Sequence, residues 1–440
     1  MRLQTLSKDE IIKKYLELEK ENEKLKKAKE ALEKELRKYK NPNTPSSAYP
    51  FLKSCVKPSA RSRRRGAPKG HPGTTRPWPV PHEKRLIRGK KCPNCHSKDV
   101  EVVDQRHQQV EEMPPDIRPQ IVNVVRDVCT CNKCGLKFQA RDGCTPLQGR
   151  FGINLMVLVI FLKFIVRGVL RKTSSFLDVS FALKLAPASV QAIIERAAKA
   201  GEMEYAALKS KIMAAKLLYI DETSLRVLGQ NWWVWAFRSE TDLLLVIRNS
   251  RGNNVLEEIL GKDYTGTVVC DCWRAYDFLS NATLQRCWAH LLRKSKELES
   301  VAGKHFHKKL NELFEQIIKF NSKERTEKQR RQKYEQLTAE MQKTISYYSR
   351  YEECQAVTKY INFHLESWFT CIRHAGVQPT NNYAEQAIRE TVLVRKIIGA
   401  FRSEKGTKTY ETLASLITTW QIQKKDIKTE IHRMLTTNLC

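Results

Sequence analysis

Hydrophobic residues recur at every seventh position through residues 1–40, a stretch dense in Glu, Lys and Leu. The recurring positions are Ile11, Leu18, Leu25, Leu32 and Tyr39. If these are the d positions of a heptad repeat, Asn22 falls at an a position, where a polar residue sets the register of a two-stranded coiled coil. A solitary charged surface helix is the alternative, because other a positions are polar as well. The pattern predicts a coiled-coil oligomerisation arm.

Residues 148–215 are rich in apolar residues and predict a helical region. Its longest apolar stretch, INLMVLVIFL, is followed by Lys163 and is too short to span a bilayer, so a buried helix is expected. Downstream, SSFLDVSFALKLAPASVQAIIERA predicts a short helix, a turn containing Pro187 and a second helix opened by Ser189. The two helices could form a helix-turn-helix that binds DNA, and a packing role stays at least as open.

Residues 216–292 contain the runs that predict strands. KLLYIDETSLRV, NWWVWAFRS and DLLLVIRNS follow one another as three strand-like segments. RGNNVLEEILG is typical of a helix, and TGTVVCDCWRAYDF predicts a fourth strand. This order of elements is that of the front half of a ribonuclease-H-like α/β core, in which the first and fourth strands lie side by side.

The two strands that should be neighbours each carry an acid, Asp221 on the first and Asp271 at the end of the fourth. Adjacent carboxylates are costly unless a cation neutralises them, and hard divalent cations prefer carboxylate oxygen. The sequence therefore predicts a metal site here. Glu222 should point to the opposite side of its strand, as a surface acid or, alternatively, as a support for the site. Cys270 and Cys272 flank Asp271 and should face away from it.

A third acid must come from an element packed near these strands. Residues 293–376 are rich in Lys, Glu and Gln and predict an all-helical insertion. In residues 377–400, PTNNYAEQAIRETVLVRK places Glu385 in the first turns of a capped helix. An acid beside cations suits metal binding next to a phosphodiester, whereas an ordinary amphipathic helix is equally compatible with the spacing. The cations are Arg389, Arg395 and Lys396.

The charge balance favours a polyanionic partner. Lys and Arg total 78 against 48 Asp and Glu, which gives a formal net charge of +30. A Pro-rich linker over residues 41–91 predicts a DNA-contacting arm, with a solvated linker as the alternative. Its densest part is Arg61, Arg63, Arg64 and Arg65. The N-terminus lacks the apolar core of a signal peptide, which predicts a cytoplasmic protein.

Thirteen cysteines in such a chain indicate metal ligands or buried thiols rather than disulfides. Residues 92–147 hold two C-x-x-C knuckles, formed by Cys92, Cys95, Cys131 and Cys134. Four thiolates suit tetrahedral Zn²⁺, so a closed, structural zinc ribbon is favoured over four unrelated cysteines. The C-x-x-H pair of Cys287 and His290 supplies only two ligands, which favours a packing role or a phosphate contact by His290.

Four motifs follow in order along the chain: YIDETSLRV, VVCDCWRAYD, QRCWAHLLRK and TNNYAEQAIR. Together they resemble the transposases of the insertion sequence 66 family, as does the closing stretch RKIIGAFRSEKGTKTYETLASLITTW. The resemblance implies a multidomain α+β protein. Its parts would be an N-terminal coiled coil, a zinc ribbon, a helical DNA-binding region and a ribonuclease-H-like α/β catalytic core with an all-helical insertion. Residues 401–440 would form a C-terminal helical tail.

By this resemblance, Asp221, Asp271 and Glu385 are the catalytic acids of a DDE motif that binds two Mg²⁺ or Mn²⁺ ions. The protein would bind transposon ends in double-stranded DNA, cleave them by two-metal-ion hydrolysis and join the 3′-OH ends to target DNA. Because two ends must be held together, a homodimer or larger homo-oligomer is expected, with accessory proteins of the same element as further partners and no membrane. Such a protein would be cytoplasmic and nucleoid-associated.

Two other functions stay open on the residues alone. One is a catalytically silent zinc-ribbon regulator that binds DNA, and the other is a different ribonuclease-H-like nuclease, such as a junction resolvase. The presence of all three acids argues against the first function. The ordered motifs and the oligomerisation arm argue against the second.

Overall fold

A computed structural model describes residues 117–440 without interruption. It also describes short pieces of the preceding chain, at residues 21–25, 28–30, 80, 87, 93–99 and 101. The chain divides into two units, one of residues Pro45–Gln120 and one of Met1–Thr44 with Ile121–Cys440. The predicted coiled coil and basic linker lie largely outside the described residues, although the pieces at 21–25 and 28–30 are helical. No helix in the described part is long and apolar enough to cross a membrane.

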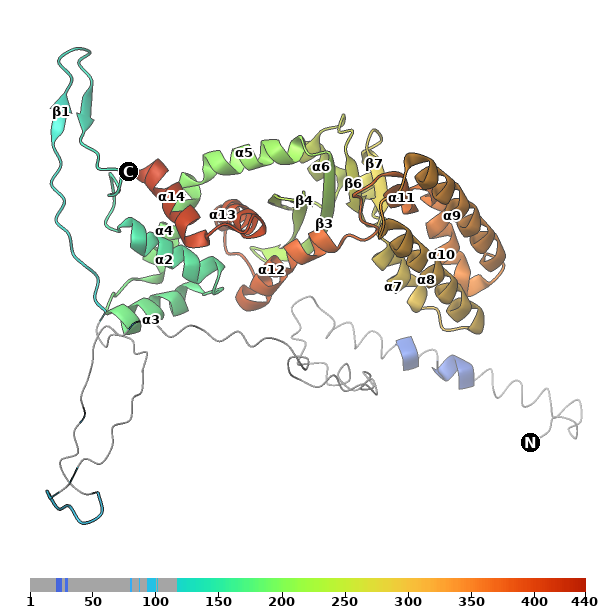
Figure 1. Cartoon of the computed structure of the whole chain (residues 1–440), viewed down its shortest axis with the longest axis horizontal. Helices are drawn as coiled ribbons and strands as arrows, with labels where there is room; N and C mark the ends of the chain where they lie inside the picture. Colours follow the sequence, from blue (N-terminus) through green and yellow to red (C-terminus); the bar gives the residue numbers. More distant parts are fainter. Residues whose placement is uncertain are drawn as a thin grey trace, which may run out of the picture. The chain divides into compact units, whose positions relative to one another are not determined.

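A five-stranded sheet with the order β5-β4-β3-β6-β7 forms the centre of the larger unit (Figure 1). Its strands are β3 (Leu217–Val227), β4 (Gln230–Arg238), β5 (Leu243–Arg248), β6 (Thr267–Cys270) and β7 (Thr283–Arg286). β3, β4 and β5 form an antiparallel meander, whereas β6 pairs in parallel with β3 on one side and with β7 on the other. The predicted neighbours, the first and fourth strands, are therefore paired.

Alternating side chains of the sheet enter different hydrophobic clusters, as the period of two along a strand requires. Leu218 and Ile220 of β3 pack with helices α4 (Pro187–Ala200), α5 (Glu202–Met213) and α6 (Asn253–Leu260), together with the even-numbered residues of β6. On the opposite face, Leu225 and Val227 pack with α12 (Asn382–Ile398) and α13 (Glu404–Ile422). Asp221, which has the parity of Leu225, lies on the face that α12 covers.

The helical region before the sheet consists of α2 (Ile153–Phe164), α3 (Leu170–Phe181), α4 (Pro187–Ala200) and α5 (Glu202–Met213). The predicted pair of helices is present as α3 and α4. The second helix begins at Pro187 rather than at Ser189. Proline is favoured there because a backbone N–H in the first helical turn has no acceptor within the helix, so its absence costs nothing. The long apolar stretch is the buried helix α2, which packs against α4 and α14.

The segment between β7 and α12 consists of helices and connecting loops and contains no strand, in agreement with the helical insertion predicted for residues 293–376. It contains α7 (Trp288–Lys296), α8 (Val301–Asn321), α9 (Glu327–Tyr348), α10 (Glu352–Phe363), a 3-10 turn at Leu365–Trp368 and α11 (Thr370–Arg373). These helices gather at the β7 end of the sheet around their own buried cluster (Figure 1). A capping box between Thr326 and Gln329 fixes the start of α9.

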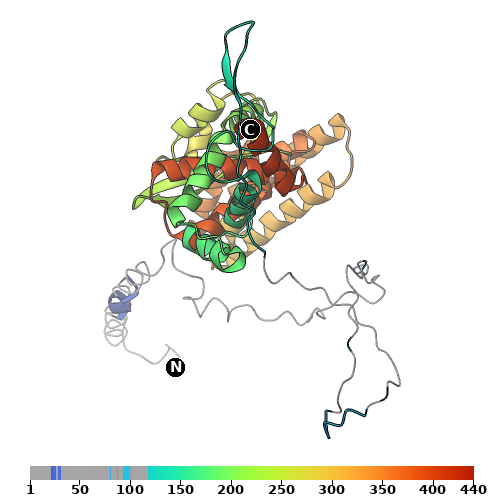
Figure 2. The same ribbon diagram turned by 90° about the vertical axis from the view of Figure 1, so that its left-hand side faces the viewer.

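The last two helices do not form a separate tail. Both views show the red C-terminal helices beside the green helices of residues 150–215 (Figures 1 and 2), and α14 (Ile427–Leu439) packs against α2 and α4. Helix α13 covers β5, which is an edge strand. Three of its side chains, one turn apart, accept hydrogen bonds from outward β5 amides at 2.9–3.0 Å: Glu411, Ser415 and Thr419. The helix thus occupies the place of a sixth strand.

Candidate active site

The three predicted acids lie near one another although they come from three elements. The parallel register pairs Tyr219 of β3 with Val269 of β6, so two residues further along, Asp221 is level with Asp271. Glu385 lies in the first turn of α12, which crosses β3 and β4 on the face that carries Asp221. Asp221 is close enough to both other acids for their negative charges to raise its pKa.

Asp221 is the most strongly perturbed carboxyl group of this cluster. Burial, followed by the negative charges of Glu222, Asp271 and Glu385, raises its pKa to about 8. Without a counter-cation, the site therefore holds a proton at neutral pH. A group of carboxylates that cannot all ionise alone is the arrangement expected for a cation site.

Asp271 directly follows the last residue of β6. Its Oδ1 accepts a hydrogen bond from the backbone N–H of Trp273 at 2.8 Å, and its carbonyl accepts one from the buried guanidinium of Arg286 at 2.7 Å. Cys270 is buried in the cluster beneath the sheet, on the side away from Asp271, as expected. Cys272 lies beyond the strand and packs against the helices of the insertion, so the strand alternation does not extend to it.

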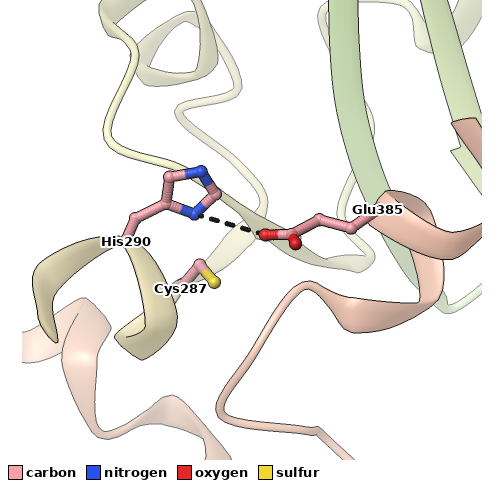
Figure 3. A group of neighbouring side chains, drawn as sticks. All are labelled: Cys287, His290 and Glu385. Atoms are coloured by element: carbon pink, nitrogen blue, oxygen red, sulfur yellow. Dashed lines mark ion pairs between the residues drawn. The ribbon is translucent and has the colours of Figure 1, made fainter. Parts of the chain in front are cut away.

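Glu385 faces the first turns of α7, as Figure 3 shows. Arg293 donates a hydrogen bond to Glu385 Oε1 at 2.8 Å, and His290 Nδ1 lies 3.8 Å from the same oxygen. The possible ligand atoms of Cys287, His290 and Glu385 all lie within 4.8 Å of one another. The sequence signals at α7 are the C-x-x-H spacing and the motif QRCWAHLLRK, which also contains Arg293, but neither predicts the contact of Arg293 with Glu385.

His290 is suited to accept a hydrogen bond rather than to carry a positive charge. Burial, followed by the nearby charge of Arg293, lowers its pKa, so the ring is neutral at pH 7. Its Nδ1 is buried and has no hydrogen-bond partner in the described part of the chain. Burial raises the pKa of the Cys287 thiol, which keeps that sulfur protonated and makes it a poor metal ligand.

Glu222 is not a surface acid, which corrects the favoured interpretation. It does point to the opposite face from Asp221, but its side chain is buried. It accepts hydrogen bonds from Tyr276 Oη at 2.6 Å and from Arg251 Nε at 2.8 Å. The Arg251 guanidinium also lies over the rings of Trp233 and Trp273, with 4.8 and 4.3 Å between its carbon and the ring centroids. Glu222 therefore supports the strand behind Asp221.

The predicted DNA-binding residues of α12 have different surroundings. Arg389 and Lys396 are exposed, make no ion pair within the described residues and share the helix face of Glu385. Arg395 donates instead to Thr223 Oγ1 at 3.2 Å and to the Ser224 carbonyl, which ties α12 to β3. The predicted arginines of the basic linker lie outside the described residues.

The second cysteine knuckle adopts a tight turn between the strands β1 (Val128–Thr130) and β2 (Lys137–Gln139). Gly135, at φ +74°, closes the turn by donating to the Cys131 carbonyl at 2.8 Å. Backbone hydrogen bonds from Cys134 and Lys133 lower the pKa of the Cys131 thiol, which favours the thiolate that a metal binds. Cys92 lies outside the described residues and Cys95 belongs to the other unit, so the four-cysteine zinc site stays a prediction.

Comparison with known proteins agrees with the motifs around these acids. The description "Transposase IS66 family" belongs to the family whose model matches residues 148–409, from the helical region into α13. The chain is also 22% identical over 402 residues to "Uncharacterized protein y4hP" of Sinorhizobium fredii (strain NBRC 101917 / NGR234), which covers 80% of this chain and 72% of that protein. The family match covers more than half of the chain and contains all three candidate acids. The chain therefore belongs to the IS66 family of transposases.

Proposed function

We propose that this transposase cleaves DNA at transposon ends and joins the freed 3′-OH ends to target DNA, with Asp221, Asp271 and Glu385 as its DDE catalytic acids. The observation that carries the proposal is the convergence of these carboxylates at one end of the β3–β6 pair. Asp271 and Glu385 each raise the pKa of Asp221, so the ionisation of the three groups is coupled.

The donor set fits hard divalent cations. Carboxylate oxygens are the ligands that Mg²⁺ and Mn²⁺ prefer, and burial together with the neighbouring carboxylates raises the pKa of Asp221, a shift that a bound cation would oppose. The buried Oδ1 of Asn381, next to β3, also has no partner within the described residues. Asp221, Asp271 and Glu385 would hold the two ions. Bound there, the ions would supply an activated attacking oxygen and would stabilise the leaving oxygen.

The remaining groups of the site would position DNA. Arg293 and neutral His290 flank Glu385, and Arg389 lies one turn further along α12, so cationic and hydrogen-bonding groups adjoin the acids. These groups would hold the phosphate to be cleaved in line with its attacking oxygen. No covalent link between protein and DNA is required, so no hydroxyl nucleophile is assigned.

The sheet supports a ribonuclease-H-like assignment for this core. Its antiparallel β5-β4-β3 meander continues through parallel β6 and β7, and the acids lie on the central strand and its parallel neighbour. In this proposal residues 216–292 and 377–400 form the core, and residues 293–376 are its insertion. Residues 148–215 would contribute to DNA binding, and residues 401–440 would complete the packing of the core.

The N-terminal third of the chain would hold DNA and a second protomer. Residues 1–40 would join protomers, residues 41–91 would follow the phosphate backbone, and residues 92–147 would form the zinc ribbon. Zinc held by four thiolates has no open coordination position, so its role is structural. A homo-oligomer would bring two transposon ends together.

The proposal is tested with the full-length protein and a labelled duplex that carries the DNA ends flanking its gene. Metal-dependent nicking and strand joining are expected in Mg²⁺ and should stop in EDTA. Replacing any acid, as in Asp221→Asn or Glu385→Gln, should lower cleavage by roughly 10³-fold or more while DNA binding persists. Glu390→Gln is the matched control, because Glu390 is on the same helix but pairs with Arg167, away from the acids.

Three results would contradict the proposal. Cleavage retained by Asp221→Asn would remove the assigned acid from the reaction. Zinc-dependent DNA binding without nicking would indicate a regulator. Efficient cleavage of four-way junctions without joining of ends would indicate a resolvase.

A further inference from the structure

Asn381 connects two of the elements that carry the acids. It is completely buried and immediately precedes α12. Its side-chain Nδ2 donates a hydrogen bond to the Ile220 carbonyl at 2.7 Å, and Ile220 immediately precedes Asp221. Its own carbonyl accepts from the backbone N–H of Glu385 at 3.0 Å. One residue therefore ties the backbone at the first acid to the backbone at the third.

Cys287 makes the equivalent connection to the second acid. It is also buried, and it immediately precedes α7. Its backbone N–H donates to the Cys270 carbonyl at 2.8 Å, and Cys270 immediately precedes Asp271. Asn381 and Cys287 are themselves joined, because the Asn381 backbone N–H donates to Cys287 Sγ at 3.1 Å. The residue before each aspartate is thus hydrogen-bonded to Asn381 or to Cys287, and these two residues are hydrogen-bonded to each other.

We propose that Asn381 and Cys287 are positioning residues of the active site, which set the spacing of the three carboxylates for divalent cations. This inference rests on the proposed function, because it assigns the pair to the same acids. Neither residue touches the reacting atoms in this proposal. Each acts through the backbone next to an acid.

The choice of residues at these positions supports a specific role over simple packing. A buried amide costs free energy wherever its polar atoms lack partners, and Asn381 Oδ1 has none within the described residues. An apolar side chain would fill the same space without that cost. It would also leave the Ile220 carbonyl without this donor and the helix carrying Glu385 without its tie to β3.

The test measures Mn²⁺ binding by calorimetry to the full-length protein, which needs no DNA and no turnover. Asn381→Leu keeps the branched shape of the side chain but loses the donor, and Cys287→Ala removes the sulfur acceptor. Each change should weaken Mn²⁺ binding by roughly 10–100-fold, the usual cost of removing a group that orients metal ligands. Cys287→Ser retains an acceptor at the same position and should stay close to the wild type.

The matched control is Cys354→Ala. Cys354 is as deeply buried as Cys287, but it lies in the helical insertion and its thiol accepts no hydrogen bond within the described residues. This variant should bind Mn²⁺ like the wild type. Unchanged Mn²⁺ affinity in folded Cys287→Ala, or equal losses in Cys287→Ala and Cys287→Ser, would overturn the proposal. The cysteine pair decides the matter even if Asn381→Leu does not fold.

A second measurement separates this inference from the proposed function. In metal-free protein, amide hydrogen exchange of the segment around Glu385 should become faster in Cys287→Ala and should stay slow in Cys287→Ser. If the wild type binds Mn²⁺ but cleaves no DNA, the proposed function fails while the positioning role stands. If exchange around Glu385 is the same in both cysteine variants, the positioning role fails whatever the wild type cleaves.

Discussion

At the scale of single residues, the site gathers negative charge that the fold alone does not compensate. Asp221 is buried beside Glu222, Asp271 and Glu385, and Glu222 is paired with the Arg251 guanidinium on its own side of the sheet. Arg293 compensates part of the charge of Glu385 from the more exposed side. The chain thus accepts local destabilisation at a position where a cation would relieve it.

This electrostatic cost predicts a pH dependence of stability in EDTA. The pKa of Asp221 is raised from 3.8 to about 8 in the folded chain, so the folded state keeps a proton that the unfolded state loses. The contribution of Asp221 to the free energy of unfolding is fully present below about pH 4 and is lost as the pH rises towards about 8. Urea unfolding of the wild type should therefore show falling stability across this window.

Asp221→Asn is the variant that checks this assignment. It should flatten the pH dependence and should exceed the wild type in stability by about 1 kcal/mol or more near pH 8 without metal. Some dependence should remain, because burial also raises the pKa of Glu222. Parallel curves for the two proteins would show that Asp221 titrates normally.

The sequence identifies the acids more readily than the residues that hold them. Asp221 and Asp271 can be located because each accompanies a recognisable strand, and Glu385 because its helix matches a family motif. Arg293, Asn381 and the burial of Glu222 depend on where α7 and α12 cross the sheet. Local patterning contains no information on such crossings, since residues far apart in the chain create them.

At the scale of elements, α13 shows how a helix can complete a sheet. Its side chains Glu411, Ser415 and Thr419 satisfy the amides of β5 that no strand pairs with. Glu411 also accepts from Tyr205 and Lys408, both at 2.7 Å. The family resemblance implies helices in residues 401–440. It does not reveal that polar side chains of α13 are buried together with its apolar ones.

Ser415→Ala should therefore be costly for a small substitution. It leaves the buried amide of Leu245 without its acceptor, which should lower the free energy of unfolding by about 1–3 kcal/mol. The matched control is Ser210→Ala on α5, whose exposed hydroxyl bonds only to its own helix and should cost less than about 0.5 kcal/mol. Urea denaturation measures both values, and equal costs would show that the contact to β5 contributes nothing.

At the scale of the whole molecule, positive charge is distributed unevenly. The formal net charge of +30 predicts strong, salt-dependent association with DNA. Only part of it lies near the acids, where Arg293, Arg389 and Lys396 are exposed. Composition predicts a polyanionic partner, but it does not indicate which part of the chain contacts that partner.

The salt dependence of DNA binding tests the basic linker. Replacing Arg61, Arg63, Arg64 and Arg65 with alanine should make the slope of log K against log salt less steep by up to roughly 3–4, since each phosphate contact contributes about 0.9. The control replaces four exposed lysines of equal total charge that lie outside the proposed DNA-binding segments, Lys343, Lys359, Lys424 and Lys428. Equal changes in slope would show that net charge alone, rather than the linker, determines the affinity.

The cover that α13 provides for β5 has a consequence for protein synthesis. The β3–β4–β5 meander leaves the ribosome well before residue 404, so for part of translation β5 has a bare edge that can pair with strands of other nascent chains. Glu385 also emerges late, so a chain terminated before residue 385 lacks the third acid. The last part of translation would therefore both cover the exposed edge of β5 and bring Glu385 to the other two candidate acids.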